Sequence, residues 1–324
     1  MPARIKLAGG IYLTPMNSYE LSKMDSNFAT KCVMCRDELT KDTKSVEHIY
    51  PKWLQERYGL WDKTMTLPNG SQTPYRQLTV PCCKECNGGV MAEREKLIQQ
   101  ASEQGYDCFV ELSEEVIAWW VMKLYYAKLI KELSFKENII DPASEMMITD
   151  ERMVEYNIIF YYMSELIKGA KLNDPKPYEL YIYRTASNND FDYIDDTLRH
   201  VVYIQISDIL IVCALDSFGF FKVQYQRETE RLRELEVVHP LQAIELFSKI
   251  VYFKSHYRFD TEHTSIIDRQ GLTINSKIRN PQQLREFNLI ELHNLMENLF
   301  KLRGYAFEIP PFQEGKMFSL ILNK

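Results

Sequence analysis

Two pairs of cysteines with the same spacing constrain the fold of this chain more than any other feature. Cys32 and Cys35 form one C-x-x-C pair, Cys83 and Cys86 form a second, and 47 residues separate the pairs. Two thiolates at this spacing can bind one ion from a single tight turn, and two such turns complete a tetrahedral site for Zn²⁺. The sequence therefore predicts a structural zinc site, with an intervening chain that forms structure of its own.

The distribution of cysteine favours metal binding over disulfides. The chain has seven cysteines, an odd number, and five of them lie within the first 86 residues. The N-terminal stretch MPARIKLAGG lacks the apolar core of a secretory signal, so we expect a cytoplasmic protein with reduced thiols. One ligand of the second pair stays undecided, because Cys82 rather than Cys83 could bind the ion together with Cys86. Cys83 is preferred since it restores the symmetric spacing.

The charge of the chain argues against a protein that coats nucleic acid with its whole surface. The net charge is −6, which has the wrong sign for that role. Residues 31–96 carry eleven basic and nine acidic side chains, a balance of +2, so the rest of the chain carries −8. The candidate phosphate contacts in this more basic segment are Lys52, Arg57, Lys63, Arg76 and Lys84.

Length and pattern predict two domains and an α+β fold. A chain of 324 residues is long enough to form two domains, each with its own core. The cysteine-bearing module is predicted to span 1–105, with its core at about 30–98, and a larger α/β domain is predicted to span 106–324. The longest apolar run, 201–215, is interrupted by polar residues and is too short to span a bilayer. We therefore expect no membrane partner.

Periodicity and turn residues predict most of the elements outside the cysteine pairs. Helices are expected after Gly89, after an N-cap at Ser113, and over 150–168, 240–256 and 281–303. Strands are expected over 178–183, 201–206, 209–215 and 220–225, with a hairpin turn at 216–219.

An acid–histidine pair lies between the two cysteine pairs, in the stretch SVEHIYPKWL. The order C-x-x-C, then EHI-x-P, then C-x-x-C-N resembles the HNH endonuclease family, the zinc-stapled branch of the ββα-metal nucleases. The residues that carry this resemblance are Cys32, Cys35, Glu47, His48, Ile49, Pro51, Cys83, Cys86 and Asn87.

The resemblance implies a two-stranded hairpin followed by a helix, with a role for each matched residue. His48 would be the general base that deprotonates the attacking water, since a neutral imidazole accepts protons near pH 7. Glu47 and Asn87 would bind a catalytic Mg²⁺ or Mn²⁺, which prefers oxygen ligands. Adjacent strand residues point to opposite faces, so a bulge or twist at Glu47 and His48 is expected.

The function implied is a metal-dependent endonuclease that hydrolyses phosphodiester bonds in DNA. The C-terminal domain would then recognise a target, sense a signal, or bind a protein partner or a second copy. Nucleases of this architecture resemble effectors of bacterial anti-phage defence. Two alternatives stay open: an RNA-cleaving nuclease, and a non-catalytic zinc module that binds nucleic acid or protein.

Overall fold

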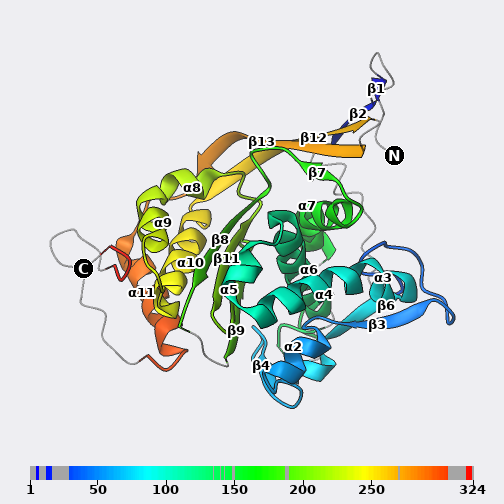
Figure 1. Ribbon diagram of the computed structural model, residues 1–324, viewed down its shortest axis with the longest axis horizontal. Helices are drawn as coiled ribbons and strands as arrows, with labels where there is room; N and C mark the ends of the chain where they lie inside the picture. The colour runs from blue at the N-terminus through cyan, green and yellow to red at the C-terminus, as the bar shows by residue number, and fades with distance from the viewer. Residues whose placement is uncertain are drawn as a thin grey trace. The chain divides into compact units, whose positions relative to one another are not determined.

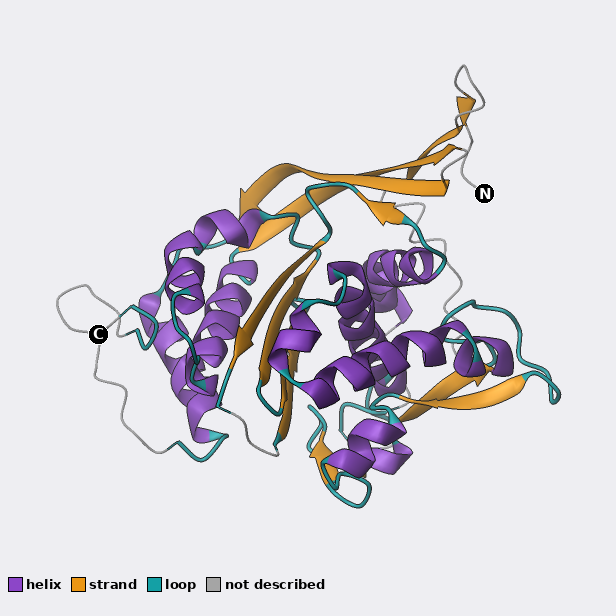
Figure 2. Cartoon of the chain, in the orientation of Figure 1, coloured by secondary structure: helices purple, strands orange, loops and turns teal. Residues whose placement is uncertain are grey.

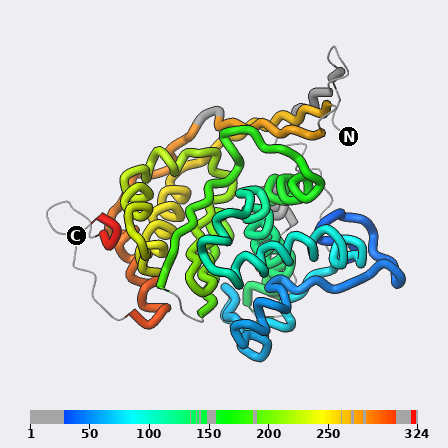
Figure 3. The backbone as a smooth tube through the Cα atoms, in the orientation of Figure 1, coloured from blue at the N-terminus to red at the C-terminus, as the bar shows by residue number. Residues whose placement is uncertain are grey.

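Helices and strands alternate irregularly along the chain, so the predicted α+β class is confirmed (Figures 1 and 2). The chain, whose trace Figure 3 colours by residue number, forms two compact units, and each unit is made of three separate stretches of sequence. Unit 1 comprises 1–104, 111–173 and 263–275, and unit 2 comprises 105–110, 174–262 and 276–324. The structure, a computed structural model, describes residues 5–6, 12–16, 29–133, 135–138, 140–141, 143–147, 150–186, 190–268, 271–305 and 319–322.

The cysteine-bearing part of unit 1 is built on two antiparallel strands and the helices that follow them. Strand β3 (Lys44–His48) pairs with β6 (Thr79–Cys83), and α3 (Lys84–Gly88) begins directly after β6. The longer helix α4 (Val90–Gln104) follows, as predicted after Gly89. The chain between the two strands forms α2 (Lys52–Arg57), β4 (Thr64–Thr66), β5 (Gln72–Pro74) and a 3₁₀ turn, η1 (Tyr75–Gln77).

Unit 1 does not end at the predicted boundary after residue 105, because two further helices belong to it. Helix α6 (Glu114–Glu132) begins at the predicted N-cap, where the Ser113 hydroxyl accepts a hydrogen bond from the Val116 amide at 3.3 Å. Nearly all of α6 is buried, and it packs against α4, β6 and α7 (Asp150–Ile167). A helix that is apolar on all sides needs partners on all sides, and the cysteine-bearing module supplies some of them.

A five-stranded sheet of order β1-β2-β12-β13-β7 includes two long strands, β12 (Tyr257–Asp268) and β13 (Gly271–Gln283). The short strands are β1 (Ile5–Lys6), β2 (Tyr12–Met16) and β7 (Lys171–Leu172). Both long strands lie in a stretch for which no strand was predicted. The final helix, α11 (Leu289–Lys301), therefore begins eight residues later than the predicted start at residue 281.

Unit 2 is built on a four-stranded sheet of order β8-β11-β10-β9. All three pairings are antiparallel, whereas an α/β domain has a largely parallel sheet. The two central strands are buried along their whole length, and helix α10 (Pro240–Lys254) packs against them. The strands are β8 (Tyr178–Arg184), β9 (Phe191–Asp196), β10 (Val201–Ile206) and β11 (Ile209–Leu215).

The strand predicted over 220–225 is wrong, because this segment forms helix α8 (Phe220–Gln224). Gly219, in the left-handed region at φ 78°, turns the chain after β11. The buried Glu179 carboxylate then accepts hydrogen bonds from the backbone amides of Phe221 at 2.9 Å and Lys222 at 2.6 Å. A carboxylate at a helix N-terminus satisfies amides that have no partner within the helix. Helix α9 (Gln226–Arg233) follows α8.

Among the helices in the described ranges, none combines the length and the apolar character that crossing a membrane requires.

Candidate metal centre and histidine site

The first cysteine pair lies on a tight loop before β3. The Cys32 amide donates to the Asp37 carbonyl at 2.9 Å, and the Arg36 amide donates back to the Cys32 carbonyl at 3.0 Å. Arg36, directly after Cys35, adopts a left-handed φ of 65°. The Met34 amide points at the Cys32 sulfur, with a distance of 3.4 Å from nitrogen to Sγ. This loop therefore turns both thiols to the same side.

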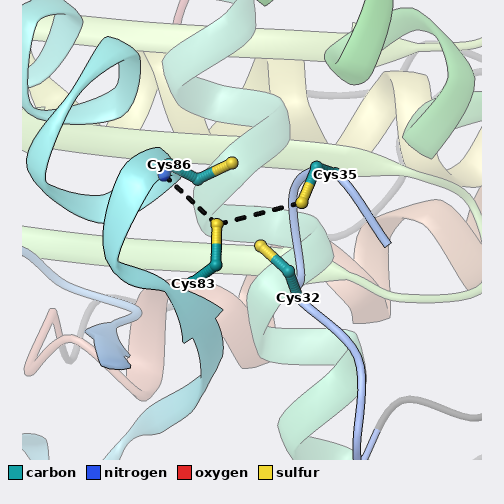
Figure 4. A group of neighbouring side chains, drawn as sticks. All are labelled: Cys32, Cys35, Cys83 and Cys86. Atoms are coloured by element: carbon teal, nitrogen blue, oxygen red, sulfur yellow. Dashed lines mark hydrogen bonds between the residues drawn. The ribbon is translucent and has the colours of Figure 1, made fainter. Parts of the chain in front are cut away.

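The second pair lies where β6 meets α3. The Cys83 sulfur accepts a hydrogen bond from the Cys86 amide at 3.3 Å, so Cys83 is both the N-cap of α3 and a partner of Cys86. The four sulfur atoms of the two pairs lie within 4.8 Å of one another, and they face one another in Figure 4. The Sγ atoms of Cys35 and Cys83 are 3.9 Å apart. These four cysteines could hold a metal ion.

Cys82 lies beside this group but outside it. Its sulfur is 3.6 Å from the Cys32 Sγ and 3.9 Å from the Met91 Sδ, and its side chain is fully buried. The group with mutually close ligand atoms contains Cys83 instead, which agrees with the preference for symmetric C-x-x-C spacing. Cys82 thus packs between Cys32 and Met91, next to the group of four.

The protonation of the thiols is strongly perturbed. Burial raises the pKa of Cys35 to about 12 and raises that of Cys86 as well. A hydrogen bond from the Cys82 thiol lowers the pKa of Cys32 to about 4, and burial of Cys32 opposes this effect only in part. Four packed sulfurs cannot all be thiolates without a compensating cation. A divalent ion held by these cysteines would supply that charge and favour the thiolate form of its ligands.

The spacing of the sulfurs is compatible with a tetrahedral ion such as Zn²⁺. Tetrahedral Zn²⁺ with bonds of about 2.3 Å to sulfur separates its ligands by roughly 3.8 Å, close to the 3.9 Å between Cys35 and Cys83. Two backbone amides already donate to sulfurs of the group, which stabilises thiolates. All seven cysteines are free thiols.

His48 is the last residue of β3 and is half-buried. Its ring lies 5.9 Å from the Trp61 ring, centroid to centroid, at an interplanar angle of 32°. Burial, followed by the charge of Lys52, lowers the pKa of His48 below that of a free imidazole, and Glu47 only partly opposes this. The imidazole is therefore held in its neutral form near pH 7, with an exposed tryptophan and an exposed lysine beside it.

Glu47 points to the opposite side of the strand. Its side chain is 7% exposed, and its Oε1 lies 2.5 Å from the Lys123 Nζ of helix α6. The same ammonium lies 2.8 Å from the Glu95 Oε1 of helix α4. Burial acts against the Lys123 charge, but attraction to Glu47 and then to Glu95 holds the pKa of Lys123 above its usual range. Lys123 and Glu95 were not identified from the sequence.

Asn87 lies in α3 and binds β3 through its amide nitrogen. The Nδ2 atom donates to the Ser45 hydroxyl at 2.9 Å and to the Val46 carbonyl at 3.0 Å. Asn87 therefore braces the strand that carries Glu47 and His48. Its Oδ1 accepts no hydrogen bond from any residue in the described part of the chain.

The predicted bulge at Glu47 and His48 does not form. The β3–β6 register advances one residue at a time from Lys44 opposite Cys83 to His48 opposite Thr79. Side chains therefore alternate along β3, with Glu47 facing α4 and α6 and His48 facing Trp61. Asn87 contacts the same strand at Ser45 and Val46, while the Glu47 carboxylate is paired with Lys123.

Comparison of the chain with protein-family models, with curated proteins and with solved structures finds no match.

Proposed function

We propose that this protein is a zinc-stapled endonuclease of the HNH type that hydrolyses phosphodiester bonds in nucleic acid, with DNA as its preferred substrate. The observation that carries the proposal is the environment of His48. A half-buried imidazole with a lowered pKa lies at the end of a strand, next to an exposed aromatic ring and an exposed cation. This arrangement suits a general base at a phosphate.

The metal centre supports the proposal because its four cysteines come from the loop before β3 and from the junction of β6 and α3. Zn²⁺ bound to the four thiolates would tie the loop before β3 to the start of α3. The antiparallel β3–β6 pair with α3 directly after it is compatible with the two strands and helix that the sequence resemblance implies. In so small a region, the free energy of metal binding is also folding free energy. The zinc thus has a structural role, and His48 lies at the far end of β3 from Cys83, which pairs with Lys44.

The residues beside His48 suit a nucleotide substrate. Lys52 lies close enough to His48 to lower its pKa, and a cation in that position can bind a phosphate oxygen. Trp61, 41% exposed, can stack on a base, as aromatic side chains do at single-stranded sites. His48 would take a proton from water as the water oxygen attacks phosphorus. The bond from phosphorus to the leaving sugar oxygen would break, that oxygen would take a proton from solvent, and the imidazolium would return its proton to solvent.

Divalent-ion dependence is part of the proposal, but the Glu47 carboxylate is already paired with Lys123, and the Asn87 amide nitrogen already binds β3. We therefore assign no catalytic step to those two side chains acting together. The Glu47 ion pair also favours the second candidate, a non-catalytic zinc module.

The first test is cleavage by the purified full chain. Plasmid, single-stranded DNA and tRNA are incubated with Mg²⁺, with Mn²⁺ or with EDTA, and products are resolved on gels. We expect divalent-ion-dependent nicking of plasmid DNA that EDTA abolishes. Cleavage of tRNA alone would reassign the substrate to RNA. Binding of DNA with no cleavage under any condition would favour the non-catalytic zinc module.

The pH dependence of cleavage follows from the His48 environment. A general base works in its deprotonated form, so the rate should rise with pH through the His48 pKa and then level off. Because burial and Lys52 lower this pKa, the midpoint should lie below the value of about 6.5 for a free imidazole. Lys52→Gln removes one cause, so its kcat/KM profile should shift toward higher pH. An identical profile for wild type and Lys52→Gln would contradict this account.

A further inference from the structure

The Lys123 ammonium is surrounded by oxygen atoms of the strand that carries His48. The Lys123 side chain is 2% exposed. Besides its ion pairs with Glu47 at 2.5 Å and Glu95 at 2.8 Å, its Nζ donates to the His48 carbonyl at 2.9 Å and to the Ile49 carbonyl at 3.2 Å. A lysine is rarely buried unless its charge is compensated. Here two carboxylates and two carbonyls compensate it.

We propose that Glu47 serves as a counter-ion of Lys123 rather than as a ligand of a catalytic ion, and that Lys123 is a positioning residue for His48. The positioning half of this inference rests on the proposed nuclease function. The counter-ion half rests on the arrangement of charges alone. The two halves can therefore fail separately.

The counter-ion role follows from the environment of the carboxylate. Glu47 lies on the buried face of β3, and its partner Lys123 comes from a helix that is almost wholly enclosed. A metal ion at Glu47 would have to displace the Lys123 ammonium, which is almost wholly buried, or share the carboxylate with it at the cost of repulsion between two cations. Breaking a buried ion pair on one side leaves an uncompensated charge, which is strongly unfavourable. Retaining the pair is the stable arrangement.

The positioning role follows from the hydrogen bonds of β3. The Ile49 amide donates to the Leu78 carbonyl at 2.9 Å, and hydrogen-bonded pairs alternate along an antiparallel ladder. The carbonyls of Val46 and His48 therefore point away from β6. Asn87 binds the first of these and Lys123 the second. The two side chains thus hold the outer edge of β3, and Lys123 fixes the residue from which the imidazole projects.

Helix α6 offers a matched control for Lys123. Lys128 forms a second buried ion pair, with Glu132 at 2.5 Å and side-chain exposures of 7% and 1%. Lys123 contacts the strand that carries His48, whereas the ion pair of Lys128 joins two residues of α6 itself. Lys123→Met and Lys128→Met should both lower the melting temperature, by roughly 10 °C.

The decisive measurements are thermal unfolding and cleavage kinetics on zinc-loaded full-length variants. Glu47→Gln and Lys123→Met should each destabilise the protein, and the double variant should lose less than the sum of the two. In cleavage, Lys123→Met should lower kcat roughly 10- to 100-fold with little change in KM, whereas Lys128→Met should leave both constants near wild type. Equal losses of kcat in the two lysine variants would refute the positioning role.

The Mg²⁺ concentration that gives half-maximal cleavage separates the two roles of Glu47. A counter-ion predicts that Glu47→Gln leaves this concentration near the wild-type value. A metal ligand predicts a rise of roughly tenfold or more with unchanged melting temperature, and that result would overturn the inference. If wild type cleaves no nucleic acid, the proposed function fails. Thermal unfolding of the Glu47 and Lys123 single variants and of the double variant still tests the ion pair. If the loss of stability in the double variant equals the sum of the two single losses, the ion pair is refuted.

Discussion

Replacing Cys83 with serine should abolish stoichiometric zinc binding and unfold the β3–β6–α3 region. Cys83 contributes one of four close sulfurs, and its Sγ also accepts the amide hydrogen bond of Cys86. Zinc binding by four thiolates releases about 10–16 kcal/mol near pH 7 in small domains. A serine hydroxyl replaces a thiolate poorly, so most of that free energy is lost. The zinc content measured by elemental analysis should fall well below one per chain, and circular dichroism should show an unfolding transition at a lower temperature than in wild type.

The adjacent residue provides the matched control. Cys82→Ser makes the same atomic change one position earlier, at a side chain that packs against Cys32 and Met91 outside the group of four. It should retain one zinc per chain and cost about 1–3 kcal/mol, because a hydroxyl becomes buried among sulfur atoms. Loss of zinc from Cys82→Ser with retention in Cys83→Ser would move the ligand to Cys82. Wild-type protein without zinc, purified in the absence of chelators, would remove the metal centre altogether.

The parts of the candidate site that could be predicted from sequence are those in which the signal is local. A C-x-x-C pair reports a single tight turn, and both pairs lie on such turns. The Ser113 cap and the apolar period of α6 also arise from neighbouring residues, and that helix begins where predicted. Spacing along the chain carried this information because the contacts involved span only a few residues.

The surroundings of Glu47 could not be predicted, because its partner Lys123 lies 76 positions further along the chain, on helix α6. One signal was available in the sequence. Lys123 interrupts the apolar run VIAWWVMKLYY, and a charge inside a helix with no polar face must find a counter-ion. That argument predicts a buried ion pair, although it does not say which carboxylate completes it.

The error at residues 220–225 has a similar origin. Aromatic and β-branched residues favour a strand there, but Glu179, 42 positions before Phe221 on strand β8, accepts hydrogen bonds from the amides of Phe221 and Lys222 and caps a helix. The strand preference of these residues was therefore outweighed by hydrogen bonds to a residue distant in the sequence. The domain boundary was misplaced for the related reason that α6 belongs with the module before it.

His48→Ala should abolish cleavage while leaving zinc content and melting temperature close to wild type. Loss of a general base costs roughly 10²- to 10⁴-fold in rate. The fold should tolerate the change, because the ring is only half-buried and lies against the partly exposed ring of Trp61. The Lys123 ammonium holds the His48 carbonyl rather than the imidazole, so alanine preserves that bond. Cleavage rate, zinc content and melting temperature are measured on one preparation.

His239→Ala provides the opposite pattern and completes the argument. His239 caps α10, with its Nδ1 accepting from the Leu241 amide at 3.2 Å and its own amide donating to the Gln242 side chain. Loss of the cap should cost about 1 kcal/mol of stability and leave the cleavage rate of folded protein unchanged. A histidine that matters only for structure thus lowers the melting temperature and not the rate, whereas a general base does the reverse. Early melting or zinc loss in His48→Ala, with wild-type cleavage per folded molecule, would make His48 a packing residue and remove it from the proposed mechanism.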